Sequence, residues 1–83
     1  MDTFERTVKL IAGQTGISAE KITLETNFSA DLKMDSLDMT DLDMAIEEEF
    51  SAEFSDEIMG RVKTVRDLTG EIEKILSAGG KKA

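Results

Sequence analysis

The sequence contains no cysteine, histidine, tyrosine, tryptophan or proline. Without thiols, the chain can form neither a disulfide nor a thiolate metal site. Imidazole, thiol and phenol groups supply many of the general bases and nucleophiles of enzymes, so their absence argues against catalysis by the chain itself. We therefore do not expect an enzyme.

Long apolar runs and an excess of basic residues are also missing. No apolar segment approaches the ~18 residues of a membrane span. The net charge of −8 disfavours nucleic-acid binding, which requires clustered Lys and Arg. The opening residues, MDTFE, lack the basic and apolar regions of a signal peptide. We expect a cytoplasmic monomer that neither inserts into a membrane nor binds nucleic acid.

The pattern of apolar residues predicts an all-α fold. Apolar positions recur at helical spacing, and strand-type alternation is missing. We expect helices over about 3–14 and 36–50, a short third helix after Ser55, and a last helix starting at Thr64. One domain, 1–77, would be followed by a tail, 78–83. A connection over 17–34 is long, so its spaced apolar residues should hold it to the core; they are Ile17, Ile22, Leu24, Phe28 and Leu32.

Acidic residues are concentrated in one segment. From Asp35 to Glu57 there are ten acidic residues and no basic one, whereas the rest of the chain is slightly positive. These acids do not follow the spacing of a calcium-binding EF-hand loop, and they fall on a predicted helix instead. We therefore expect no dedicated metal site.

Ser36 opens the predicted second helix. Serine is common at helix starts, but Asp35 already supplies a cap and Asp38 completes a capping box. A hydroxyl at a helix N-terminus also suits an attached phosphate, because free N–H groups and the helix dipole stabilise the anion. On these residues alone, Ser36 is either a helix-start residue or a site modified by a separate enzyme, since no base here activates it.

The predicted second helix separates into two faces when residues are placed at 100° steps. One arc is apolar and should pack into the core together with residues from neighbouring segments: Phe28, Met39, Leu42, Ile46, Phe50, Phe54, Met59 and Val62. The opposite arc places two apolar side chains among acids. It is either a solvated face or a surface that docks basic partners; its residues are Leu37, Thr40, Asp41, Met44, Glu47 and Glu48.

The stretch Asp35-Ser36-Leu37-Asp38 resembles the Asp-Ser-Leu attachment motif of acyl carrier proteins. Residues 44–50, MAIEEEF, resemble the end of that family's second helix, and the resemblance covers about residues 4–76. It implies a four-helix bundle with a long first loop and a short third helix. It also implies that a phosphopantetheinyl transferase attaches 4′-phosphopantetheine to Ser36, and that the arm's thiol holds acyl groups as thioesters.

The resemblance further implies partners for the second helix. These would be acyltransferases, ketosynthases or related enzymes of lipid or polyketide synthesis that carry basic docking patches. The core residues named above would line any pocket for the acyl chain. The implied docking positions are Asp35, Leu37, Asp38, Thr40, Asp41, Met44, Glu47 and Glu48.

Several positions differ from the usual pattern of fatty acid carriers, among them Lys33, Met39, Asp43 and Ser55. Asp43 lies at the edge of the core arc, where a carboxylate should resist burial. These differences favour a specialised carrier for another lipid, a polyketide or an unusual acyl group. Two other interpretations stay open: an aminoacyl or peptidyl carrier, and an unmodified acidic helical module that binds a basic protein.

Overall fold

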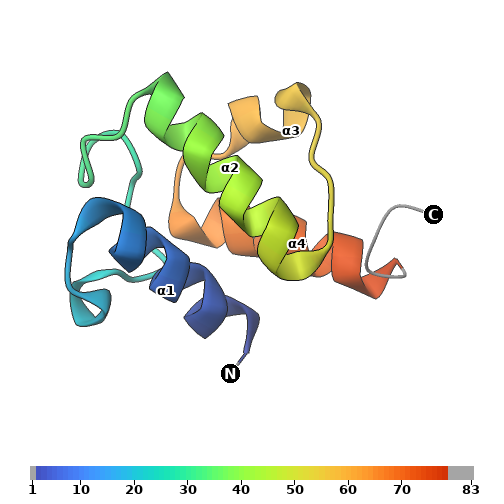
Figure 1. Cartoon of the computed structure of the whole chain (residues 1–83), viewed down its shortest axis with the longest axis horizontal. Helices are drawn as coiled ribbons and strands as arrows, with labels where there is room; N and C mark the ends of the chain where they lie inside the picture. The colour runs from blue at the N-terminus through green and yellow to red at the C-terminus, as the bar shows by residue number, and fades with distance from the viewer. Residues whose placement is uncertain (1, 79–83) are drawn as a thin grey trace.

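A computed structural model describes residues 2–78, and Figure 1 shows that these residues form a helical bundle. In this range the only strand-like pairing is an isolated antiparallel bridge between Asn27 and Thr64. The predicted all-α fold with a long first connection and a short third helix is confirmed. Its elements are α1 (Thr3–Thr15), a 3-10 turn η1 (Ala19–Lys21), α2 (Ser36–Phe50), α3 (Asp56–Arg61) and α4 (Val65–Ser77).

Each α-helix begins at a side chain that caps it. Asp2, Asp35 and Thr64 each form a capping box with the third residue of the helix that follows. Ser55 caps α3, because its Oγ accepts a hydrogen bond from the Ile58 N–H at 3.1 Å. These caps satisfy N–H groups that have no partner inside the helix, so they fix where each helix starts.

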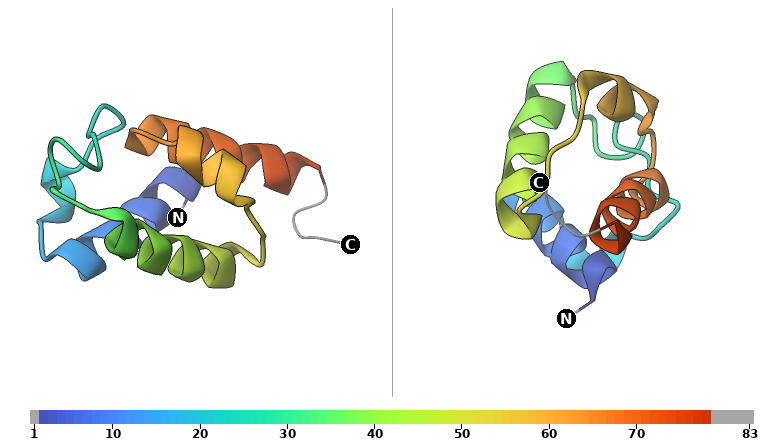
Figure 2. Two further views of the ribbon diagram at one scale, coloured as in Figure 1. Left: turned by 90° about the horizontal axis from the view of Figure 1, so that it is seen from above. Right: turned by 90° about the vertical axis from the view of Figure 1, so that its right-hand side faces the viewer.

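The helices are arranged around a common centre, as the right-hand view in Figure 2 shows. Their buried apolar side chains form one hydrophobic core. α1 contacts α2, α4 and η1, and α3 contacts α4. Every helix except the short α3 contributes fully buried side chains, so the amphipathic faces predicted from the sequence meet at this centre. The largest fully buried apolar side chains are those of Ile11, Leu42, Ile46, Val65, Leu68 and Ile72.

The connection between α1 and α2 is held against the body of the protein. Ile22 and Phe28 are buried. The Phe28 N–H donates to the Lys63 carbonyl at 3.0 Å, and the Val65 N–H donates to the Thr26 carbonyl at 3.0 Å. These bonds join the connection to the residues just before α4 and to the first residue of α4. The other predicted anchors, Ile17, Leu24 and Leu32, are partly buried against the core.

The predicted tail falls almost wholly outside the described residues. Ala78 is described and forms the end of α4, where its N–H bonds to carbonyls of the last turn. Residues 79–83 lie outside the described range. The domain boundary placed after residue 77 therefore stays a prediction.

Candidate attachment site and docking face

Ser36 is the first residue of α2, and its side chain is exposed. The caps of this helix start are two carboxylates: Asp35 Oδ1 accepts from the Asp38 N–H at 2.9 Å, and Asp38 Oδ2 accepts from the Asp35 N–H at 3.1 Å. The hydrogen bond from Asp38 holds the pKa of Asp35 below its usual value. Among residues 2–78 the Ser36 hydroxyl has no hydrogen-bond partner. The helix start therefore leaves this hydroxyl free to react.

A pocket of about 350 Å³ adjoins Ser36. Its walls come from the 27–34 connection, the first turns of α2, and α3 with the residues that follow it. The volume lies within the range of small-molecule pockets in proteins. Its apolar lining is Phe28, Met34, Met39, Met59 and Val62, and its polar lining includes Asn27, Ser29, Thr40, Asp43, Asp56 and Lys63.

The residues that the sequence assigned to an acyl pocket or core divide into two groups. Phe28, Met39, Met59 and Val62 line the pocket. The others do not line it but are buried in the core; they are Leu42, Ile46, Phe50 and Phe54. Met34 was not predicted for the pocket, because it precedes the helix and follows no periodic pattern. It is nevertheless buried and lines the pocket.

Asp43 is a partly buried acid in the pocket wall. Its Oδ1 is buried and has no hydrogen-bond partner among the described residues. Burial, followed by the nearby negative charges of Glu47 and Asp56, raises the pKa of Asp43 to about 6. Each cause disfavours the charged form, because the carboxylate loses water and faces charges of its own sign.

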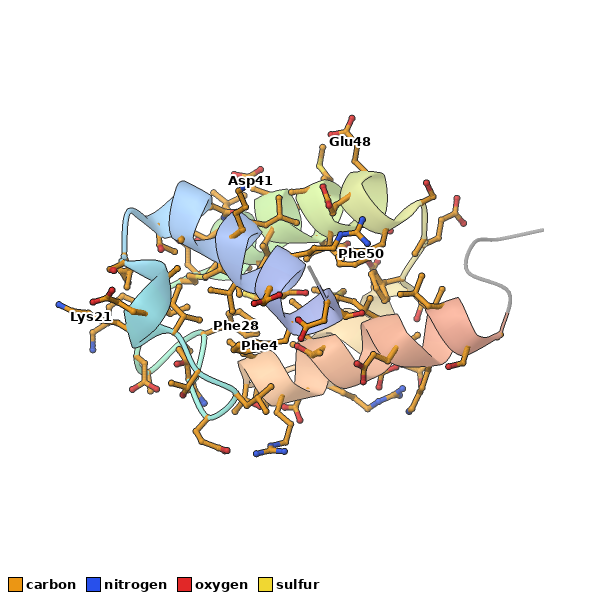
Figure 3. All side chains as sticks on the ribbon, turned by 90° about the horizontal axis from the view of Figure 1, so that it is seen from below. Phe4, Lys21, Phe28, Asp41, Glu48 and Phe50 are labelled. Carbon is orange, nitrogen blue, oxygen red and sulfur yellow. The ribbon has the colours of Figure 1, made fainter. Side chains whose placement is uncertain are left out.

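The outward face of α2 carries two large apolar side chains among acids. Leu37 is 74% exposed and Met44 is 61% exposed. Figure 3 shows Asp41 and Glu48 projecting away from the core on this helix, whereas Phe28 and Phe50 point inward. Thr40 is exposed but already bonded, since its hydroxyl donates to the Ser36 carbonyl at 2.9 Å. The face therefore combines accessible apolar area with negative charge.

Three of the acids predicted for this face have structural partners. Asp35 and Asp38 are held in the capping box that starts α2. Glu47 was expected to face solvent, but it is only partly exposed, and its Oε2 accepts from the Phe54 N–H at 3.0 Å. This bond ties the helix to the loop that follows it. A helical wheel could not reveal it, because the loop folds back only in the tertiary structure.

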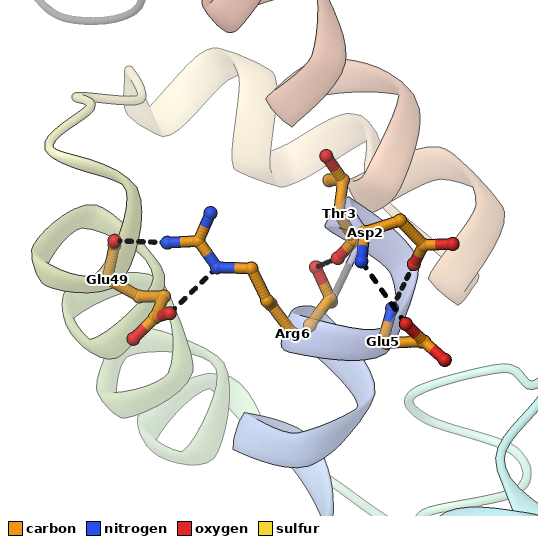
Figure 4. Close-up of polar contacts among 6 residues, drawn as sticks. Asp2, Thr3, Glu5, Arg6 and Glu49 are labelled. Carbon is orange, nitrogen blue, oxygen red and sulfur yellow. Dashed lines mark hydrogen bonds and ion pairs between the residues drawn. The ribbon is translucent and has the colours of Figure 1, made fainter.

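An ion pair that the sequence did not predict joins α1 to the end of α2. Arg6 Nε donates to Glu49 Oε2 at 2.9 Å, and the same guanidinium donates to the Glu49 carbonyl at 2.9 Å, as Figure 4 shows. The Arg6 side chain also lies 4.3 Å from the centroid of the Phe50 ring. The two partners are far apart in sequence, so no local pattern marked them. The charge of Glu49 is therefore neutralised by Arg6, whereas no cation among residues 2–78 pairs with Glu48 beside it.

The described residues provide neither a metal-binding cluster nor a membrane-spanning helix. Within residues 2–78, no group of three or more His, Cys, Asp or Glu side chains is arranged to hold a metal ion. No helix in that range has both the length and the apolar character needed to cross a bilayer.

Comparison with known proteins places the chain among phosphopantetheine-carrying domains. A family model described as "Phosphopantetheine attachment site" matches residues 5–72. A protein of Trieres chinensis named acyl carrier protein is 44% identical over 72 residues, which cover 87% of this chain and 90% of that protein. A protein of Helicobacter hepaticus with the same name is 42% identical over 73 residues, covering 88% of this chain and 96% of the relative.

Proposed function

This chain belongs to the acyl carrier protein family, whose members carry phosphopantetheine covalently on a serine, and we propose that Ser36 is that serine. The observation that carries the proposal is the position of Ser36: it is exposed at the start of α2, its hydroxyl is free, and it borders the pocket. The family resemblance inferred from the motif is confirmed. The assignment of the individual residues remains our proposal.

The surroundings of Ser36 fit a phosphodiester arm. Ser36 lies at the positive end of the α2 helix dipole, which favours an attached phosphate. The carboxylates of Asp35 and Asp38 oppose that charge, but each accepts a hydrogen bond from the helix start. When bound, the cofactor supplies the terminal thiol that forms thioesters. The chain itself anchors and presents this group, and we propose that it is not an enzyme.

We also propose that the outward face of α2 docks the enzymes that modify or use the arm. These are a phosphopantetheinyl transferase and acyltransferases, ketosynthases or related enzymes with basic patches. Exposed Asp41 and Glu48 attract such patches over a distance, and Leu37 and Met44 add contact area once the partner arrives. Asp35, Asp38 and Glu47 contribute charge at the edge of this face while they hold the helix ends.

Intact mass spectrometry tests the attachment site. The protein is incubated with coenzyme A and a phosphopantetheinyl transferase, alongside Ser36→Ala and the control Ser18→Ala, which removes another exposed serine hydroxyl. We expect one phosphopantetheine on the wild type and on the control, and none on Ser36→Ala with its helical circular dichroism unchanged. Mass gain on Ser36→Ala would refute the site. No gain in any form, with several transferases, would favour an unmodified docking module.

Kinetics with a partner enzyme test the docking face. The double variant Asp41→Asn/Glu48→Gln removes two charges from the face, and Glu20→Gln/Glu73→Gln removes two exposed charges elsewhere. We expect kcat/KM of the transferase to fall roughly tenfold or more at low salt for the first variant only. The difference should shrink at high salt, because screening weakens long-range attraction. Equal losses for both variants would mean that only net charge matters.

A further inference from the structure

Asp43 places a partly buried carboxylate in the wall of the pocket that borders Ser36. The two residues lie on the same helix, and seven residues of α-helix advance about 10 Å. Both line the same pocket, and Met39 lies between them on its wall. An acyl group carried on the arm of Ser36 that enters this pocket therefore meets apolar side chains and the carboxylate of Asp43 on the same wall.

Among residues 2–78, no group in the pocket offsets the negative charge of Asp43 or donates a hydrogen bond to it. Its Oδ1 is buried without a hydrogen-bond partner among residues 2–78. The charged groups that act on it, Glu47 and Asp56, are also acids. Lys63 lines the same pocket, but its Nζ donates to the Gly60 carbonyl at 3.4 Å, and no ion pair to Asp43 forms in the described part of the chain. Asp43 Oδ1 is thus a buried acceptor for which the described residues provide no donor.

An unsubstituted hydrocarbon chain in this pocket would further destabilise the carboxylate of Asp43. A methylene chain removes the remaining water from the carboxylate and gives no hydrogen bond in return. A hydroxyl or amino group at the right depth donates to the carboxylate instead, and the rest of the chain can still lie against Met39 and Met59. Sites built around a hydrogen bond reject analogues that lack the bonding group more strongly than apolar sites reject small changes in size.

We propose that the pocket accepts an acyl group that bears a hydrogen-bond donor, a hydroxyl or an amino substituent, which reaches Asp43. This inference rests on the proposed function, because it requires the acyl group to be tethered at Ser36. It names the cargo class by its chemistry: substituted acyl groups are preferred inside the bundle over saturated hydrocarbon chains of the same length.

Thermal unfolding of loaded forms tests the preference. The arm on Ser36 is loaded with acyl chains of one length: an unsubstituted chain, and chains with a hydroxyl or an amino group at successive carbons. We expect at least one substituted chain to raise Tm by several degrees more than the unsubstituted chain does. In Asp43→Leu this order should reverse, because an apolar wall favours the hydrocarbon. Glu20→Gln, which removes an exposed acid in η1, should keep the wild-type order.

A second readout follows the carboxyl group of Asp43 itself by NMR. A donor that reaches the carboxylate should lower the pKa of Asp43 relative to the unloaded form, whereas an unsubstituted chain should raise it further. Equal Tm shifts for all chains, with equal effects on this pKa, would overturn the inference while leaving Ser36 attachment intact. Attachment of phosphopantetheine to Ser36 is checked by mass spectrometry before these measurements. If none is attached, both the proposed function and this inference are wrong.

Discussion

Arg6 on α1 binds Glu49 on α2 through both the carboxylate and the main-chain carbonyl, with both N–O distances at 2.9 Å. The bond to the carbonyl occupies an acceptor in the last turn of α2, where carbonyls have no intrahelical partner. The guanidinium also covers the ring of Phe50, which is buried. The Arg6 side chain therefore joins α1 to α2 and satisfies a carbonyl in the last turn of α2, the helix that carries the docking face.

Replacing Arg6 by Met should lower the free energy of unfolding by about 1–2 kcal/mol, because a charge-assisted pair, a carbonyl bond and a cation–π contact are lost together. The matched control is Lys9→Met, which removes the same charge from an exposed position on the same helix. Urea unfolding followed by circular dichroism measures both. Equal effects of the two substitutions would show that the ion pair adds nothing beyond net charge.

Two substitutions on α2 should separate its buried and exposed faces. Ile46 is fully buried, so Ile46→Ala should reduce the free energy of unfolding by about 2–5 kcal/mol. Met44 is 61% exposed, so Met44→Ala should change it by less than about 0.5 kcal/mol. Met44→Ala should nonetheless weaken binding to partner enzymes. Unfolding caused by Met44→Ala would contradict the assignment of the two faces.

Asp43 should make stability depend on pH. Its folded pKa of about 6 lies above the ordinary value of 3.8, so between these values the folded state binds more protons than the unfolded state. Stability from this group is therefore present at low pH and is lost as pH rises toward about 6. Asn at position 43 has no carboxyl that becomes charged as pH rises, so Asp43→Asn should be more stable than the wild type at pH 7.

The stability that Asp43→Asn gains over the wild type should depend on pH in a measurable way. Because the carboxyl is partly exposed, solvent screening reduces the gain to about 1–2 kcal/mol. Urea unfolding of both proteins from pH 4 to pH 8 should show the advantage of Asp43→Asn growing up to about pH 6 and then levelling off. A difference that stays constant over this range would show that Asp43 has an ordinary pKa.

Lys33 adopts a left-handed backbone conformation, with φ of 58°. Side chains with a Cβ are strained there, whereas glycine is not. Lys33→Gly should therefore raise the free energy of unfolding by about 0.5–1 kcal/mol, despite losing the exposed bond from Nζ to the Ala30 carbonyl. Lys21→Gly is the control: Lys21 lies in η1, so glycine there should lower stability. Thermal unfolding measures the stability of both variants. Lower stability of Lys33→Gly than of the wild type would show that Lys33 is not strained.

Local interactions explain why much of the fold was predictable. Asp35 and Asp38, three residues apart, mark the start of α2 in the sequence, because a capping box involves only the first turn of the helix. The periodicity that puts Leu37 and Met44 on one side and Ile46 on the other is likewise a property of a single helix. The motif around Ser36 identified the family for the same reason: it is contiguous.

Contacts between distant segments could not be predicted from local sequence patterns. Glu47 was assigned to the solvent-facing arc, but the loop after α2 returns and bonds to it through Phe54. Arg6 and Glu49 meet only because α1 packs against α2. Such contacts depend on how helices cross and where loops return, which no spacing within one helix specifies.

The sequence by itself determined the four helices, their starts, and the position of Ser36 at the head of an acidic helix, because these follow from interactions within a few residues. Only the tertiary structure decided that Met34 and Met59 meet Met39 around a pocket beside Ser36. It alone also decided that Asp43 lies in the wall of that pocket without a partner in the described chain. Burial and pairing are set by neighbours that packing brings together from separate segments.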